Sequence, residues 1–132
     1  MASYRGREGA VPAADSFTAL DSLYGQSTSS SVQVPANTSA IVGIIAAVSQ
    51  SGATADNCTF AIQLTGDGLT EQQTITVGSS CNVGTETSDG TTNLPFALDV
   101  AIPVTASNQV AISGAMDADM GEAQFSVTLV FA

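Results

Sequence analysis

The side chains best suited to chemistry in this sequence are carboxylates. The densest group lies in the stretch AMDADMGEA, which contains Asp117, Asp119 and Glu122. Closely spaced carboxylate oxygens suit Ca²⁺, which takes about six to eight oxygen ligands. The EF-hand pattern is broken, however, because Met120 and Gly121 stand where further ligands and the glycine spacing would be expected. We therefore expect an acidic turn between two strands and no cofactor, with a calcium site at these three residues as the alternative.

Most other catalytic chemistry is excluded by composition, because the sequence has no histidine and no lysine. Without histidine there is no Ser-His-Asp or Cys-His nucleophile, no histidine general base and no His-ligated zinc or iron site. Without lysine there is no Schiff base and no phosphate-binding loop of the Walker type. A carboxylate-pair glycosidase is disfavoured by the absence of tryptophan for sugar stacking. We therefore predict no catalytic residues and no enzymatic activity.

The two cysteines, Cys58 and Cys81, each lie in or beside an expected strand. One interpretation is a disulfide that ties neighbouring strands, and the other is two small buried hydrophobic residues that never meet. The first residues contain no apolar core of the length a signal peptide needs, so we expect synthesis in the cytosol. Thiols stay reduced there and oxidise only after release, so both interpretations remain open.

The charge distribution argues against two classes of partner. The chain has twelve acidic residues and two basic ones, Arg5 and Arg7, for a net charge of −10, and no basic residue follows them. Affinity for nucleic acid depends on Lys and Arg neutralising phosphates, so we expect no binding to DNA or RNA. The same repulsion applies to an anionic membrane surface. An acidic, lysine-free surface is also typical of adaptation to high salt, which would be compatible with any function.

The elements that must position these residues are short strands. Val, Ile and Thr are abundant, and turn residues interrupt the apolar segments at the spacing typical of sandwiches and barrels. We predict an all-β fold, an antiparallel β-sandwich of the jelly-roll or immunoglobulin-like kind with about seven or eight strands. The expected strands are Ser31–Val34, Ala40–Val48, Cys58–Thr65, Gln73–Val77, Ser80–Val83, Phe96–Ile102, Gln109–Ser113 and Ala123–Phe131.

Alternation identifies the buried faces of two of these strands. Phe60, Ile62 and Leu64 alternate with polar residues, and so do the apolar residues of 125–131, as expected for half-buried antiparallel strands. The segment Ala40–Val48 differs, because it is apolar on both faces apart from Gly43. We expect this strand to be either central in its sheet or covered by a partner.

The first 29 residues form the second predicted region, an extended N-terminal arm and connector ahead of a β-sandwich domain at residues 30–132. Gly6, Gly9 and Pro12 discourage regular structure, and residues 16–25 offer at most one helical turn. Apolar anchors with few charges favour docking onto a protein partner, and a disordered tail is the alternative. The predicted partner-binding residues are Tyr4, Arg5, Arg7, Val11, Phe17, Leu20, Leu23 and Tyr24.

An acidic, lysine-free sandwich made in the cytosol, with an apolar-anchored and slightly basic arm, resembles the decoration or cement proteins of tailed-phage capsids. The resemblance is one of architecture over the whole chain and involves no specific motif. It implies a structural virion protein on the outer capsid surface, with the major capsid protein and copies of itself as partners. It further implies a homo-oligomer, most simply a trimer, whose arm stabilises the joints between capsid subunits.

Two other functions are compatible with the same fold. A coat subunit that forms the shell itself would have a similar composition, although the small size favours an accessory role. A carbohydrate- or receptor-binding module of a tail or fibre would need exposed aromatic residues or a metal. Aromatic residues make up only 5% of this chain, so the structural role is the leading hypothesis.

Overall fold

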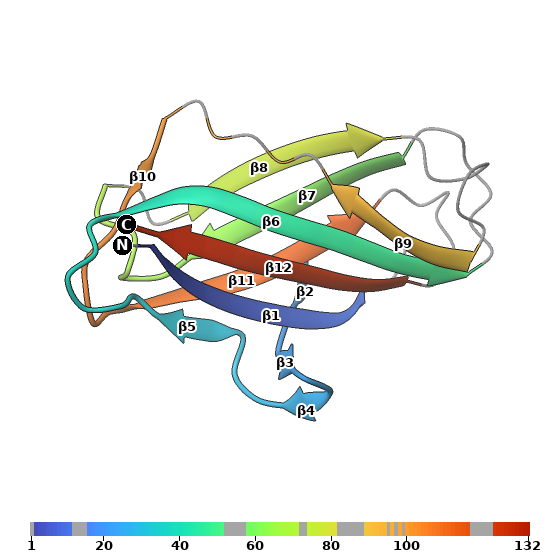
Figure 1. Ribbon diagram of the computed structural model, residues 1–132, viewed down its shortest axis with the longest axis horizontal. Helices are drawn as coiled ribbons and strands as arrows, with labels where there is room; N and C mark the ends of the chain where they lie inside the picture. Colours follow the sequence, from blue (N-terminus) through green and yellow to red (C-terminus); the bar gives the residue numbers. More distant parts are fainter. Residues whose placement is uncertain are drawn as a thin grey trace.

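The chain folds into two antiparallel sheets packed face to face (Figure 1). The computed structural model describes residues 2–11, 16–51, 58–71, 74–81, 89–94, 96, 98, 100–116 and 123–132. These residues form twelve strands, and no helix occurs among them. The predicted β-sandwich is therefore confirmed, with more strands than the seven or eight expected because several are only two or three residues long.

Sheet A contains seven strands in the order β10-β6-β12-β1-β3-β4, with β9 also paired to β6. β6 is therefore central, since β12 lies on one side of it and β9 and β10 lie on the other. The first of the two alternatives for the doubly apolar segment, a central strand, is confirmed, although Val42 and Ile45 on its outer face are exposed. The strands are β1 (Ser3–Val11), β3 (Ser22–Leu23), β4 (Gln26–Ser27), β6 (Ala40–Ser51), β9 (Asp89–Leu94), β10 (Ile102–Pro103) and β12 (Ala123–Phe131).

Sheet B contains five strands in the order β2-β11-β7-β8, with β5 also paired to β11. The chain changes sheets between β6 and β7 and again between β11 and β12, because β6 and β12 lie in sheet A while β7 and β11 lie in sheet B. The pair β6–β12 and the pair β7–β11 are each hydrogen-bonded within their own sheet. The strands of sheet B are β2 (Thr18–Ala19), β5 (Ser31–Gln33), β7 (Cys58–Thr65), β8 (Thr74–Cys81) and β11 (Gln109–Met116).

The core lies between the two sheets and follows the predicted alternation. Phe60, Ile62 and Leu64 of β7 are buried, and every second residue of β12 from Phe125 to Phe131 is buried opposite them. The rings of Phe60 and Phe125 meet edge to face across the core, with their centroids 6.2 Å apart. Burial of such apolar area is the main source of stability in a sandwich of this size.

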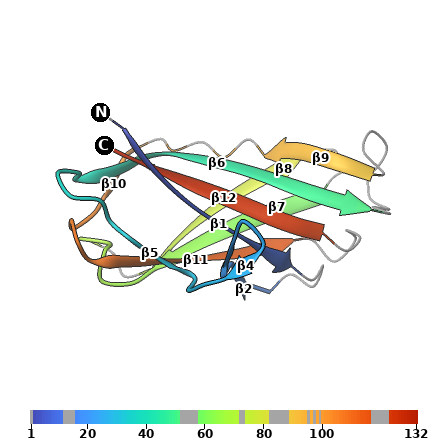
Figure 2. The same ribbon diagram turned by 60° about the horizontal axis from the view of Figure 1, so that its bottom comes forward.

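The predicted N-terminal arm is not confirmed. Residues 3–11 form β1, which pairs with β12 over nine consecutive residues from Ser3↔Phe131 to Val11↔Ala123. The two chain ends therefore lie side by side (Figure 2). The strand escaped prediction because its inward positions carry Arg5, Arg7 and Gly9, so no apolar alternation is visible. Gly9 instead leaves room for Leu20, whose Cδ2 would lie 3.3 Å from a Cβ at this position.

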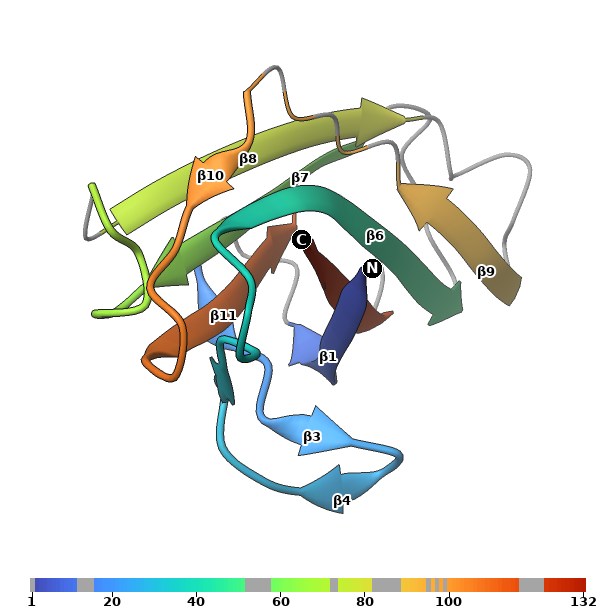
Figure 3. The same cartoon turned by 60° about the vertical axis from the view of Figure 1, so that its left-hand side comes forward.

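The rest of the predicted connector is also part of the sandwich. The chain pairs with β11 at β2, crosses to the edge of sheet A as the β3–β4 hairpin, and returns to β11 at β5. Figure 3 shows this hairpin standing away from the body of the sandwich. The backbone N–H of Leu20 donates to Ile112 O at 3.0 Å, and its side chain is fully buried. Strand pairing replaces the helical turn that was allowed for residues 16–25.

Candidate partner-binding face

The outer face of sheet A is built from three cross-strand rows on β1, β12 and β6. Register places every second residue of these strands on the same face, away from the core. The alternate positions, such as Leu129 and Ile44, are buried. The outward rows are Tyr4–Val130–Gly43, Gly6–Thr128–Ile45 and Glu8–Ser126–Ala47. We refer to these nine residues, together with Val42, as the sheet A face.

The sheet A face is apolar at one end and made of small residues elsewhere. Tyr4 and Ile45 are each 58% exposed, and Val42 is 47% exposed. Val42 reaches the surface where the register between β6 and β12 shifts, because Val130 pairs with Gly43 while Phe131 pairs with Ile41. Among these residues Glu8 carries the one charge. On a chain with twelve acidic residues, the face is thus an almost neutral area.

The β3–β4 hairpin borders this face and presents the second tyrosine. Tyr24 and Gly25 both have positive φ, 52° and 77°, as a two-residue type I′ turn requires. A bulky residue in the left-handed region is uncommon and costs backbone energy. The turn leaves the Tyr24 side chain 90% exposed. The carboxylate of Glu8 accepts a hydrogen bond from the Gly25 N–H at 2.9 Å, which fixes the hairpin tip against β1.

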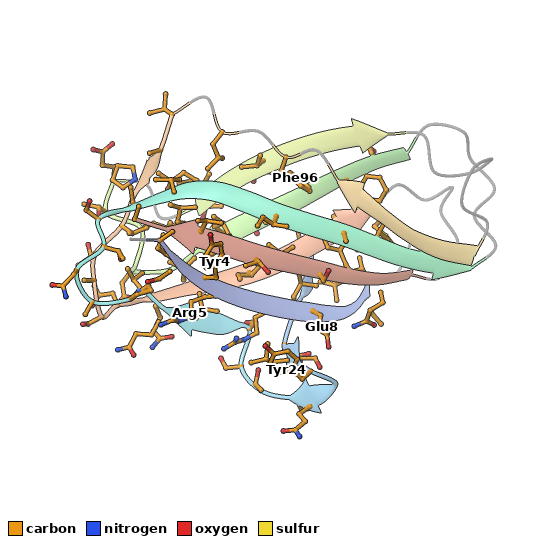
Figure 4. The ribbon with its side chains drawn as sticks, in the orientation of Figure 1. Tyr4, Arg5, Glu8, Tyr24 and Phe96 are labelled. Carbon is orange, nitrogen blue, oxygen red and sulfur yellow. The ribbon has the colours of Figure 1, made fainter. Side chains whose placement is uncertain are left out.

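A groove of about 320 Å³ lies between β1, β12 and the hairpin. Figure 4 shows Tyr4 and Glu8 along β1, with Tyr24 on the neighbouring hairpin. Both tyrosines of the chain therefore border one groove. Part of its lining consists of residues with small or hydroxyl-bearing side chains, namely Gly6, Ser126 and Thr128. The groove could accept a flat ring or a short polar group, and it contains no described pair of carboxylates that could act as acid and base.

The two arginines have different roles in the structure. Arg7 is half-buried and donates from Nε to Ser29 O at 2.7 Å and from Nη2 to Ser31 O at 3.2 Å. It thereby holds the segment before β5 against β1. Arg5 is exposed and donates only to Tyr4 O, its neighbour in sequence, at 2.8 Å. Of the two, Arg5 is the one whose guanidinium is free to meet a partner.

The eight residues predicted for partner binding separate into three groups. Val11 and Leu20 are buried in the core, so the prediction is wrong for them. Tyr4, Arg7, Leu23 and Tyr24 come together around the groove. Phe17 is 41% exposed immediately before β2, and Arg5 is exposed on β1.

The outward residues of β12 were not predicted to form part of a binding surface. The signal that was present is the doubly apolar character of Ala40–Val48, a segment that includes the exposed Val42 and Ile45. Pairing of β12 with β1 as well as with β6 then extends the surface to Tyr4. That pairing could not be predicted without recognising β1 as a strand.

The calcium alternative at Asp117, Asp119 and Glu122 falls outside the described residues. Within the described part of the chain, no group of three or more acidic or cysteine side chains is placed to hold a metal ion. Asp67, in the turn that follows β7, has a structural role. Its Oδ1 accepts from the Gln109 N–H at 3.1 Å, which ties the turn after β7 to β11. Likewise, the described residues contain no helix that could span a membrane.

No protein-family model matches the sequence, and a search of curated proteins finds no significant match.

Proposed function

We propose that this chain is a structural virion protein of the decoration or cement type, which binds the outer surface of a capsid through the sheet A face. The observation that carries the proposal is the exposed apolar end of this face, formed by Tyr4 on β1 and by Val42 and Ile45 on β6, the two strands that flank β12. Contiguous apolar surface on a polar protein is typical of an interaction site. Aromatic residues at the centre of such a surface commonly dominate the binding energy.

The charge of the chain indicates which surface it would bind. A protein with a net charge of −10 is repelled by other acidic surfaces and attracted to basic ones. The partner should therefore present an apolar patch with basic residues around it. An anionic protein is also suited to the outside of a shell whose interior holds nucleic acid.

The proposed binding mode differs from the one implied by the capsid resemblance. An arm would be laid across neighbouring subunits, whereas β1 is integrated into sheet A and is not free to extend. Contact would instead be made by a rigid, preformed face, which loses little conformational entropy on binding. Self-association into trimers and the location on the outer capsid surface remain predictions of this proposal.

The test compares two variants for binding to purified, decoration-free capsids of the virus that encodes the chain. Tyr4→Ser/Ile45→Ser removes the apolar end of the sheet A face, while Val100→Ser removes an apolar side chain, 78% exposed, that lies outside it. We expect the wild type and Val100→Ser to co-sediment with the shells equally. Loss of two central apolar contacts should weaken binding of the double variant by about tenfold or more.

Any of the following results would contradict the proposal. One is a double variant that keeps its melting temperature and still binds at full occupancy. Another is a wild-type protein that does not bind shells, and a third is a parent genome with no capsid gene.

A second candidate function, recognition of a carbohydrate, is supported by one specific observation. The two tyrosines are both exposed and border the same groove, whose lining residues include hydroxyls of Ser126 and Thr128. Aromatic faces and hydroxyls together suit a sugar ring. Tyr24→Ser separates the two functions, because Tyr24 lies on the hairpin and outside the three rows. It should abolish saturable binding to a glycan panel and leave shell binding unchanged.

A further inference from the structure

The chain's two cysteines occupy one register position in sheet B. Strands β7 and β8 pair over eight residues, from Thr65↔Thr74 to Cys58↔Cys81. The sequence contains no other cysteine. A register shift of one residue would put the two cysteines on opposite faces of the sheet. The observed register instead places them directly opposite each other and on the same face.

This juxtaposition satisfies the backbone requirement for a disulfide. Directly opposed residues of an antiparallel pair have Cα atoms about 4.5 Å apart at non-hydrogen-bonded positions and about 5.5 Å apart at hydrogen-bonded ones. Disulfides span Cα separations of about 4.4 to 6.8 Å. Either type of position is therefore compatible with a bond, and no movement of the strands is needed.

We propose that Cys58 and Cys81 form a cross-strand disulfide that closes the open end of the β7–β8 hairpin. The connection between Thr65 and Thr74 joins the other end of the hairpin. Among the described strands β8 is an edge strand that pairs only with β7. The bond would therefore hold the part of β8 farthest from its turn, where an edge strand frays most readily.

Oxidised glutathione is a sufficient oxidant for the reaction. One cysteine thiolate attacks the glutathione disulfide to form a mixed disulfide and releases one reduced glutathione. The second thiolate then attacks the protein sulfur of this mixed disulfide and releases a second reduced glutathione. The protein loses two protons and two electrons, and one glutathione disulfide becomes two thiols. Because the cytosol keeps thiols reduced, the bond should form after the protein leaves the cell. This inference does not depend on the proposed function.

A bond between these residues should raise the melting temperature. It encloses residues 58–81 and so restricts the unfolded chain, which is how most disulfides stabilise. For a loop and a chain of this size, the expected gain is on the order of 10 °C.

The test uses the full chain, purified under reducing conditions and then incubated with oxidised glutathione at pH 8. Intact mass in denaturant should fall by about 2 Da, the two hydrogens of one intramolecular bond, and iodoacetamide should then add nothing. Reductant should lower the melting temperature of the oxidised wild type by about 10 °C. Reductant should leave the melting temperature of the Cys58→Ala/Cys81→Ala variant unchanged.

The mass measurement decides the inference even if the alanine variant folds poorly. Two thiols that still react with iodoacetamide would overturn it. Stable glutathione adducts or disulfide-linked dimers would do the same, because either would show that the two cysteines of one chain do not meet. If the mass loss is observed but reductant does not change the melting temperature of the wild type, the claim that the bond holds the hairpin is overturned.

Discussion

At the scale of single residues, the two arginines show how environment separates identical side chains. Both lie on β1 and were predicted to bind a partner, because an isolated positive charge on an acidic chain suggests docking. The structure engages Arg7 with two backbone carbonyls more than twenty residues away and leaves Arg5 exposed. Residue type and position in sequence could not distinguish them, since the difference depends on where residues 29–31 pass.

Replacing Arg7 should therefore destabilise the fold far more than replacing Arg5. In Arg7→Met the carbonyls of Ser29 and Ser31 lose a charged donor in a half-buried site. Hydrogen bonds to charged groups contribute about 1.5 to 3 kcal/mol, so we expect the free energy of unfolding to fall by about 2 kcal/mol. Arg5→Met, the matched control, should change it by less than about 0.5 kcal/mol, as exposed substitutions usually do. Urea denaturation measures both, and equal effects would contradict the assignment.

At the scale of elements, the strands that were predicted well are those whose side chains alone determine the pattern. β7 and β12 alternate between apolar and polar residues, and their buried faces are the predicted ones. β1 and β9 have no such pattern. β9, with the sequence DGTTNL, falls outside all the expected strands, yet it pairs with six residues of β6. In both strands backbone pairing with an apolar neighbour decides the conformation, and a single segment of sequence does not reveal its neighbour.

Only part of the candidate site could be predicted from the sequence. The residues of the sheet A face on β6 were accessible from the sequence, because a strand that is apolar on both faces has more apolar side chains than the core can bury. The contribution of Tyr4 was recognised only as part of an arm. Its position beside Val130 depends on the pairing of the first strand with the last, which no local pattern indicates.

Deleting residues 1–11 should destabilise the whole domain. The truncation removes β1 from between β12 and β3 and takes the buried Val11 with it. It also leaves unpaired the edge of β12 that β1 covers, and it exposes the apolar residues beneath. We therefore expect the protein to aggregate or to lose at least about 3 kcal/mol of stability. Removal of residues 1 and 2 is the control and should have little effect, since pairing begins at Ser3. Circular dichroism and thermal melts decide the outcome, and a truncated domain with an unchanged melting temperature would restore the arm interpretation.

At the scale of the whole molecule, the fold depends on contacts between distant parts of the chain. β1 pairs with β12, β6 pairs with β12, and β7 pairs with β11, so the central strands of sheet A are complete only when the C-terminal strand is present. The sheet A face therefore exists only in the finished fold. Such non-local topology favours slow folding and a rigid product, and a rigid product suits a protein that presents a preformed face to a partner.

Net charge is the other property of the whole molecule, and it predicts how stability depends on salt. At pH 7 the chain carries −10, and every residue after Gln26 that is charged is acidic. Self-repulsion of this kind opposes the compact state and is screened as the Debye length falls from about 30 Å at 0.01 M salt to about 8 Å at 0.15 M. Raising NaCl over this range should therefore increase the melting temperature by about 5 °C.

The charge-reduced variant Asp21→Asn/Glu71→Gln isolates the electrostatic part of this salt effect. Both side chains are exposed, and removing two negative charges changes the net charge from −10 to −8. The variant should melt higher than the wild type at 0.01 M salt and respond less to added NaCl, because it has less repulsion to screen. A neutral solute such as sucrose at matched osmolality controls for general solvent effects, and it should raise the melting temperatures of both proteins equally. If the two proteins instead gain the same number of degrees from NaCl, their stabilisation does not come from screening, and the surface charge has no measurable effect on the stability of the fold.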